Sequence, residues 1–185
     1  MTIDMTRHNG ATGISVAECI DQRFGVWRVR TDFQPDIDPE TEEQRGVTFI
    51  ETEFPYKPTI AEVKDFVLSV VNAKTTALII AGFDYKVKHG KQKGTHVKVW
   101  LSSANQQDFH AMHQNADGLD FPVRYKIGEL EGGTPVYEEF ADAEEMHDVC
   151  KLTASHILSC QQEGWAEKDA IDWTPYEEAL DPEVE

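Results

Sequence analysis

His110 and His113 come nearest to a metal-binding pattern in this sequence. They lie three positions apart beside Asp108, in a segment expected to be helical, and that spacing places two side chains on one helix face. A closed metal site needs three or four ligands, and no neighbouring residue completes one. We therefore predict no metal and no other cofactor. A metal-dependent hydrolase that uses these two histidines ranks third among the functional hypotheses.

Two further pairs combine a histidine with a cysteine near the C-terminus. His147 precedes Cys150 by three residues, and His156 precedes Cys160 by four. A cysteine nucleophile needs a lowered thiol pKa, which a nearby cation or a helix N-terminus provides. Both cysteines fall inside a predicted helix in acidic surroundings, so we exclude a cysteine protease. With Cys19 they form an odd set without a CxxC motif, typical of free, buried thiols in a reducing compartment.

The common catalytic and nucleotide-binding motifs are missing from the sequence. It contains no GxxxxGK[ST], GxGxxG, HExxH or GxSxG pattern. Carboxylate pairs are abundant, but so acidic a chain brings carboxylates together by chance. The sequence therefore predicts a protein that is not an enzyme.

Lysines gather in one short segment that ends just before Trp100. Five of the seventeen basic residues lie within thirteen positions: Lys86, Lys88, Lys91, Lys93 and Lys98. Such a segment could contact an acidic partner or a phosphate backbone, and with Trp100 it is the predicted partner-binding site. The alternative is a solvated edge strand, which lysines protect from aggregation.

A later part of the sequence has the opposite charge, and we call it the acidic belt. It consists of Glu138, Glu139, Asp142, Glu144, Glu145 and the acidic C-terminal segment. One copy could therefore dock its lysines on the belt of another. Contacts of this head-to-tail kind build rings or filaments, and we expect them to weaken with salt.

Composition limits the partners further. The chain of 185 residues has 34 acidic and 17 basic side chains, a formal net charge of -17. This charge repels phosphate backbones at long range and does not favour nucleic-acid binding. The first twenty residues contain no apolar run, so we expect neither a signal peptide nor a membrane span. We therefore expect synthesis and folding in a cytoplasm.

The N-terminal part, residues 1–55, is predicted to be an arm followed by a strand pair. Residues 1–24 are polar and are expected to be loosely held. Val26–Arg30 and Val47–Phe54 have the composition of strands, and Asp32–Gly46 reads as a solvated loop.

Residues 56–180 are predicted to form an α+β domain, an antiparallel sheet built from two hairpins and packed against three helices. Capping-box patterns predict helix starts at Thr59–Glu62, Ser103–Gln106 and Asp142–Glu145, and Gly82, Gly118 and Gly164 are the expected stops. Alternating apolar residues predict hairpins at 83–101 and 121–140. Residues after Trp165 are expected to be irregular, and 181–185 to form a disordered acidic tail.

Two tryptophans suit either a core or an interface. Trp165 directly follows Gly164 and is expected to close the core. Trp100 alternates with Val99 and Leu101, and we expect it on an exposed sheet face.

Two segments carry a resemblance to a known family. Val99–Gln106, before a Phe-bearing helix, and Gly164–Trp173, followed by Tyr176-Glu-Glu-Ala, resemble a phage and prophage domain-of-unknown-function family encoded beside tail-fibre genes. The similarity covers about residues 56–180 and includes Lys57–Phe66. Family members often have a short turn where this chain has Lys88–His96.

The resemblance implies a tail or tail-fibre context with a structural or assembly role, and no catalytic residues are carried over from it. Our first hypothesis is a tail or tail-fibre-associated protein that binds other phage structural proteins, or further copies of itself. The second is a free adaptor or chaperone of the host cytoplasm, absent from the particle.

Overall fold

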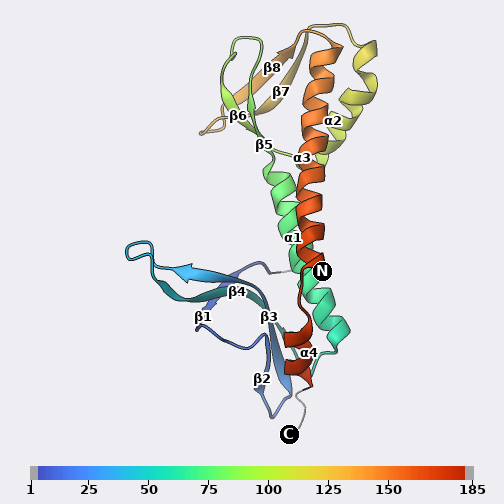
Figure 1. The fold of residues 1–185 in the computed structure, drawn as a ribbon. Coiled ribbons are helices and arrows are strands. Elements are labelled where there is room, and N and C mark those ends of the chain that lie inside the picture. The colour runs from blue at the N-terminus through green and yellow to red at the C-terminus, as the bar shows by residue number, and fades with distance from the viewer. Residues whose placement is uncertain (1–3, 182–185) are drawn as a thin grey trace. The chain divides into compact units, whose positions relative to one another are not determined.

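The computed structural model describes residues 4–181 (Figure 1). Of the predicted disordered tail, residues 182–185 lie outside the described part of the chain. The described residues divide into two compact units, 4–74 with 166–181, and 75–165. This division differs from the expected boundary at residue 55, because helices α1 (Ile60–Ala81) and α3 (Ala143–Asp169) each contribute residues to both units.

The first unit contains a four-stranded antiparallel sheet. Its strand order is β1-β4-β3-β2, with β1 at Arg7–Gly10, β2 at Ala17–Asp21, β3 at Val26–Ile37 and β4 at Gln44–Phe54. The predicted strand pair is the centre of this sheet. The expectation of a loose N-terminal arm was wrong for the described residues, because β1 and β2 are short strands at the sheet edges.

The solvated loop expected at 32–46 was also wrong over most of its length. β3 and β4 continue to pair as far as Ile37 and Gln44, and Figure 1 shows their hairpin extending beyond the other strands of the sheet. Pro35 is tolerated there because β2 pairs with β3 only at residues 26–29, which leaves β3 with a single neighbour at Pro35. Pro35 and the acidic residues thus correctly predicted that this segment is exposed to solvent, but they did not predict that its backbone is a strand.

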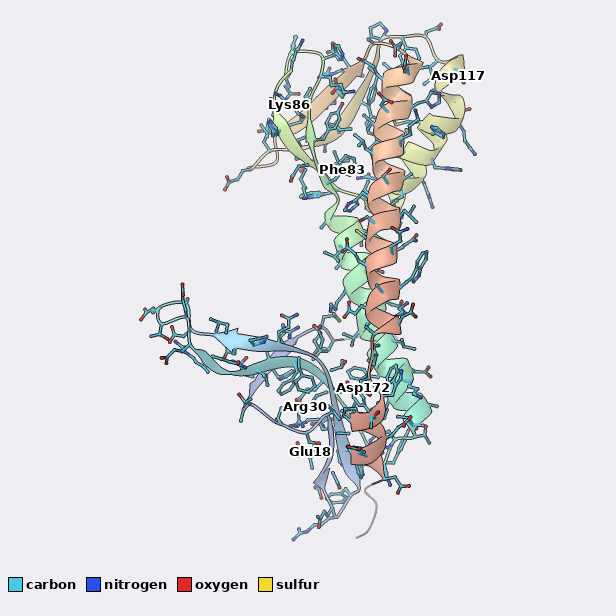
Figure 2. All side chains as sticks on the ribbon, in the orientation of Figure 1. Glu18, Arg30, Phe83, Lys86, Asp117 and Asp172 are labelled. Atoms are coloured by element: carbon cyan, nitrogen blue, oxygen red, sulfur yellow. The ribbon has the colours of Figure 1, made fainter. Side chains whose placement is uncertain are left out.

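Arg30 is the charged centre of the first unit. The residue is 2 % exposed, and its guanidinium donates to Glu18 at 2.6 Å, to Glu51 at 3.1 Å and to the Ser15 carbonyl at 2.9 Å. Figure 2 shows Arg30 and Glu18 on neighbouring strands. These bonds offset the cost of burying the charge, so we interpret the cluster as structural.

Residues after Trp165 are more regular than expected. α3 continues to Asp169, and a further helix, α4, spans Thr174–Leu180. Pro175 lies in the first turn of α4, where its missing N–H has no helical partner to lose. The Tyr176 hydroxyl donates to the Arg30 carbonyl at 3.1 Å, which fixes α4 to the sheet of the first unit.

The second unit carries both predicted hairpins in one antiparallel sheet, ordered β5-β6-β7-β8. The strands are β5 at Phe83–Lys86, β6 at His96–Val99, β7 at Val123–Glu129 and β8 at Pro135–Phe140. Figure 1 shows α3 and α2 (Ser103–Asn115) on one side of this sheet. Its core includes Val99, Leu101, Val136, Phe140 and Met146, all nearly inaccessible to solvent.

Helix starts agree with the sequence except at α2. Glu62 accepts from the Thr59 N–H at 2.8 Å and returns its own N–H to Thr59 Oγ1 at 3.3 Å, which confirms that capping box. At α2 the capping residue is Ser102, whose hydroxyl accepts from the Asn105 N–H at 3.2 Å. The predicted box was therefore one residue too late.

Gly82 and Gly164 have opposite roles. Gly82 ends α1 at a positive φ of 67°, where a Cβ would lie 1.7 Å from the Val99 carbonyl oxygen. Gly164 does not end α3, contrary to the expectation. It is a buried helical residue at which a Cβ would lie 2.2 Å from Thr75 Oγ1, so it permits a close approach of α1 and α3.

Among residues 4–181, no helix combines the length and apolar character that a membrane span requires.

Candidate functional site: a basic sheet face

The predicted lysine site forms one continuous hairpin, which we call the lysine hairpin, residues 86–98. Lys86 pairs opposite His96, and Lys98 pairs opposite Asp84. Opposite residues of antiparallel strands share a face, so Lys86 and Lys98 lie on the same side of the sheet. In Figure 2, Lys86 projects away from α2 and α3. All five lysines are exposed, while Tyr85, Val87, Val97 and Val99 are buried, as the alternation predicted.

Glu138 of β8 holds the connection of this hairpin from inside the unit. Its carboxylate is 1 % exposed and accepts from the N–H groups of Lys88 at 2.7 Å and His89 at 2.8 Å. It also accepts from the Tyr85 hydroxyl at 2.8 Å. Burial raises the pKa of Tyr85 well above its ordinary value, and the bond to Glu138 raises it further. Glu138 is therefore not part of an exposed belt, contrary to the sequence interpretation.

Gln92 anchors the tip of the lysine hairpin to the edge of β8. Its side-chain amide donates to the Pro135 carbonyl at 3.0 Å and accepts from the Tyr137 N–H at 2.9 Å. The amide therefore occupies the hydrogen-bonding groups that a neighbouring strand would use. His89 adds a contact of 2.7 Å with Glu145 of α3. Together with Glu138, these contacts fix the backbone that displays the lysines.

Other residues of the acidic belt also make contacts within their own unit. Glu145 accepts from the Ala141 N–H at 2.9 Å in addition to its contact with His89. Glu139 lies so close to Gly90 that a Cβ there would meet its carboxyl carbon at 2.8 Å. Belt and hairpin are thus neighbours inside one unit, which weakens the belt as a docking surface for another copy.

Strand order adds two cations that sequence reasoning did not assign to the site. Arg124 and Lys126 lie on β7, beside β6, and both are exposed. Arg124 stacks its guanidinium 3.9 Å from the centre of the Tyr137 ring, and Lys126 forms an ion pair with Glu129. The alternation of apolar and polar residues along β7 predicted that both side chains face solvent. Only the pairing of Lys98 with Glu129 places β7 beside the lysine hairpin.

We call the resulting surface the basic sheet face. It comprises Lys86, Lys88, Lys91, Lys93, Lys98, Trp100, Arg124 and Lys126. Acidic residues interrupt it, since Asp84 lies 3.5 Å from Lys98 and Glu129 contacts Lys126. Among residues 4–181, no ion pair occupies Lys86, Lys88, Lys91 or Lys93, so these cations are available to a partner.

Trp100 stands at the edge of the basic sheet face with 57 % of its surface exposed, as predicted. Its backbone is fixed, because its carbonyl accepts from the Asn105 side chain at 2.7 Å and the next N–H, of Leu101, donates to Ile80 at 3.0 Å. Trp165 is 53 % exposed and does not close the core, contrary to the expectation. Gly164 faces α1 instead, and one helical step turns Trp165 outward.

The histidines pair differently from the sequence prediction. His113 meets His147 of α3, with their Nδ1 atoms 2.9 Å apart, and His147 Nε2 lies 3.4 Å from Asp117. His110 does not join them. Within residues 4–181 no group of three or more His, Cys, Asp or Glu side chains has a metal-binding arrangement. The absence of a metal stays a prediction, which elemental analysis of the purified protein tests.

The cysteines also lack the surroundings of a nucleophile. Cys160 lies 3.6 Å from His156 on the same helix face, and Cys150 donates to the Phe109 carbonyl at 3.3 Å. Burial raises the pKa of both thiols. A nucleophilic cysteine requires the opposite shift.

The first unit presents an acidic surface, which we call the acidic tip, residues 36–43 of the β3–β4 hairpin. It carries five carboxylates: Asp36, Asp38, Glu40, Glu42 and Glu43. Asp38 is tied to Arg45 and caps the turn by accepting from the Glu40 N–H at 2.7 Å. Ile37 beside it is 49 % exposed and Phe33 is 37 % exposed.

Comparisons with protein-family models, with curated proteins and with solved structures gave no match for this chain. Its class is that of an α+β protein with two antiparallel sheets, one of which presents a basic face.

Proposed function

We propose that this chain is a phage-encoded virion or tail-assembly protein that acts by binding another protein through the basic sheet face. One observation supports the binding role most strongly. In a protein of net charge -17, exposed cations are concentrated on a hairpin whose backbone Glu138 and Gln92 hold in place. A fixed backbone lowers the entropy lost on binding.

The chemistry of the face favours an acidic protein over a nucleic acid as partner. The lysines attract carboxylates, and Trp100 adds a large apolar contact of the kind enriched in binding hot spots. Asp84, Glu129 and Glu139 stand among the cations, where they would repel a continuous phosphate backbone. The phage context comes from the sequence resemblance of residues 56–180 and is part of the proposal.

Quantitative mass spectrometry of phage particles, purified from the strain that encodes the chain, tests this role. A structural subunit appears in fixed copy number relative to tail proteins. A protein found only in tail-assembly intermediates supports the assembly role, in which the chain is a cytoplasmic adaptor or chaperone. Absence from both particles and intermediates would contradict the proposal.

A further inference from the structure

The strongest candidate for an acidic partner lies in the chain itself. The lysine hairpin contains five lysines and no acidic residue, whereas the acidic tip contains five carboxylates and no basic residue. The two surfaces belong to different units of the chain and are present in equal number in any population of molecules. One charge on each surface is already paired, Lys98 with Asp84 and Asp38 with Arg45. Among residues 4–181, the other four lysines and the other four carboxylates form no ion pair, so partner and site are opposite in charge and present in equal amount.

Apolar groups on the two surfaces match as well. Trp100 exposes more than half of its surface at the edge of the basic sheet face, and Ile37 exposes about half of its surface beside the carboxylates of the acidic tip. Burial of apolar surface supplies the affinity that exposed ion pairs alone do not, since a single exposed pair contributes about 0–1 kcal/mol.

Hydrogen bonds hold the backbone of both surfaces in place. The acidic tip closes on itself, because the Asp38 N–H donates to the Glu43 carbonyl at 2.9 Å and the Glu42 N–H donates to the Asp38 carbonyl at 2.9 Å. The lysine hairpin is held by Glu138 and Gln92. Surfaces whose backbone is already held in this way lose less conformational entropy when they associate.

We infer that the basic sheet face of one copy binds the acidic tip of a second copy. This inference rests on the proposed function and adds a second copy of the chain to the partners of the basic sheet face. Because the two surfaces differ, the contact is heterologous, and it joins copies head to tail into a ring or an open chain. The earlier expectation of docking on the Glu138–Glu145 belt is replaced, because Glu138 is buried and Glu145 is bound within its own unit.

Reciprocal charge reversal tests the inference in the full-length chain. One variant reverses the face (K88E/K91E/K93E) and the other reverses the tip (E40K/E42K/E43K). Each variant alone brings like charges together and should sediment as a monomer. An equimolar mixture restores opposite charges at both contacts and should associate again. Both variants keep a net negative charge, so a general attraction between them cannot produce that result.

Sedimentation velocity at about 150 mM and at about 500 mM salt provides the measurement, because screening at the higher concentration weakens such contacts. The wild type should associate at the lower salt and dissociate at the higher. The control K57E/K64E/K151E carries the same charge change outside the face and should associate like the wild type. A mixture that stays monomeric, or a wild type that is monomeric at both salts, overturns the inference.

The experiments can contradict the second-copy contact and the proposed function independently. A monomeric wild type that still binds phage tail proteins through the lysine hairpin contradicts only the second-copy contact. Loss of tail binding as well contradicts the proposed function.

Discussion

Glu138 and Tyr85 share a buried hydrogen bond of 2.8 Å that joins β8 to β5, the two outer strands of their sheet. The same carboxylate accepts the N–H groups of Lys88 and His89. A buried acid therefore shapes the most basic segment of the chain. Glu138 thus links the stability of the sheet to the proposed binding surface, alongside the contacts of Gln92 and His89.

Removal of that carboxylate should destabilise the second unit. E138A removes the acceptor of the Tyr85 hydroxyl and of the Lys88, His89 and Glu139 N–H groups, at an expected cost of about 3 kcal/mol. Chemical denaturation measures the change, and E131A, at an exposed turn residue, should have almost no effect. Equal stability of E138A and wild type would show that these donors find other acceptors.

Gly164 should tolerate no side chain. In G164A, the new Cβ meets Thr75 Oγ1, and such overpacking costs about 1–3 kcal/mol, whereas the helix propensity of Ala returns only about 1 kcal/mol. We expect a net loss in the free energy of unfolding. In T75A/G164A the clashing hydroxyl is gone, so the added cost of G164A should be smaller in the T75A background. A stabilised G164A would refute the close approach of the two helices.

The three thiols should differ in reactivity. Cys150 and Cys160 are each 6 % exposed, and burial raises the pKa of both, so few thiolates form at neutral pH. A thiol reagent should label Cys19 in the native protein and the other two only after unfolding. C19S should remove the native reaction. Rapid labelling that persists in C19S would contradict the burial of the other two.

The stability that Glu62 contributes at the N-terminus of α1 should depend on pH. The Thr59 N–H and the Tyr56 hydroxyl both donate to Glu62 and lower the pKa of its carboxyl. A lowered folded-state pKa stabilises the fold above the ordinary pKa, and this contribution disappears as pH falls through the folded value. Wild type should therefore melt above E62Q at neutral pH, and the two should converge in acid. A difference that persists in acid would point to a cause other than charge.

Local patterns predicted local structure well. The Thr59–Glu62 capping box, the stop at Gly82 and the alternation around Tyr85 and Val97 all depend on residues close in sequence, and the structure confirms each. Gly164 shows the limit, because a glycine that ends a helix and a glycine that allows close packing look alike until the opposing Thr75 is known.

Features that depend on long-range pairing were not predicted. The strand at Arg7–Gly10 exists through its partner β4, about forty residues away. Arg124 and Lys126 join the lysine hairpin only through the order of strands in the sheet, and Glu138 looked like one exposed acid among many. The lysines and Trp100 were chosen correctly as exposed residues, while their role in binding remains a proposal.

The central claim is that the basic sheet face binds a phage protein. Its most direct test compares the tail proteins recovered with tagged wild type, K88E/K91E/K93E and K57E/K64E/K151E from phage-producing cells, after confirming that all three melt alike. Identified tail proteins should accompany the wild type and the control, and the face-reversed variant should lose them. Equal recovery with all three proteins, or recovery with none, would contradict the claim.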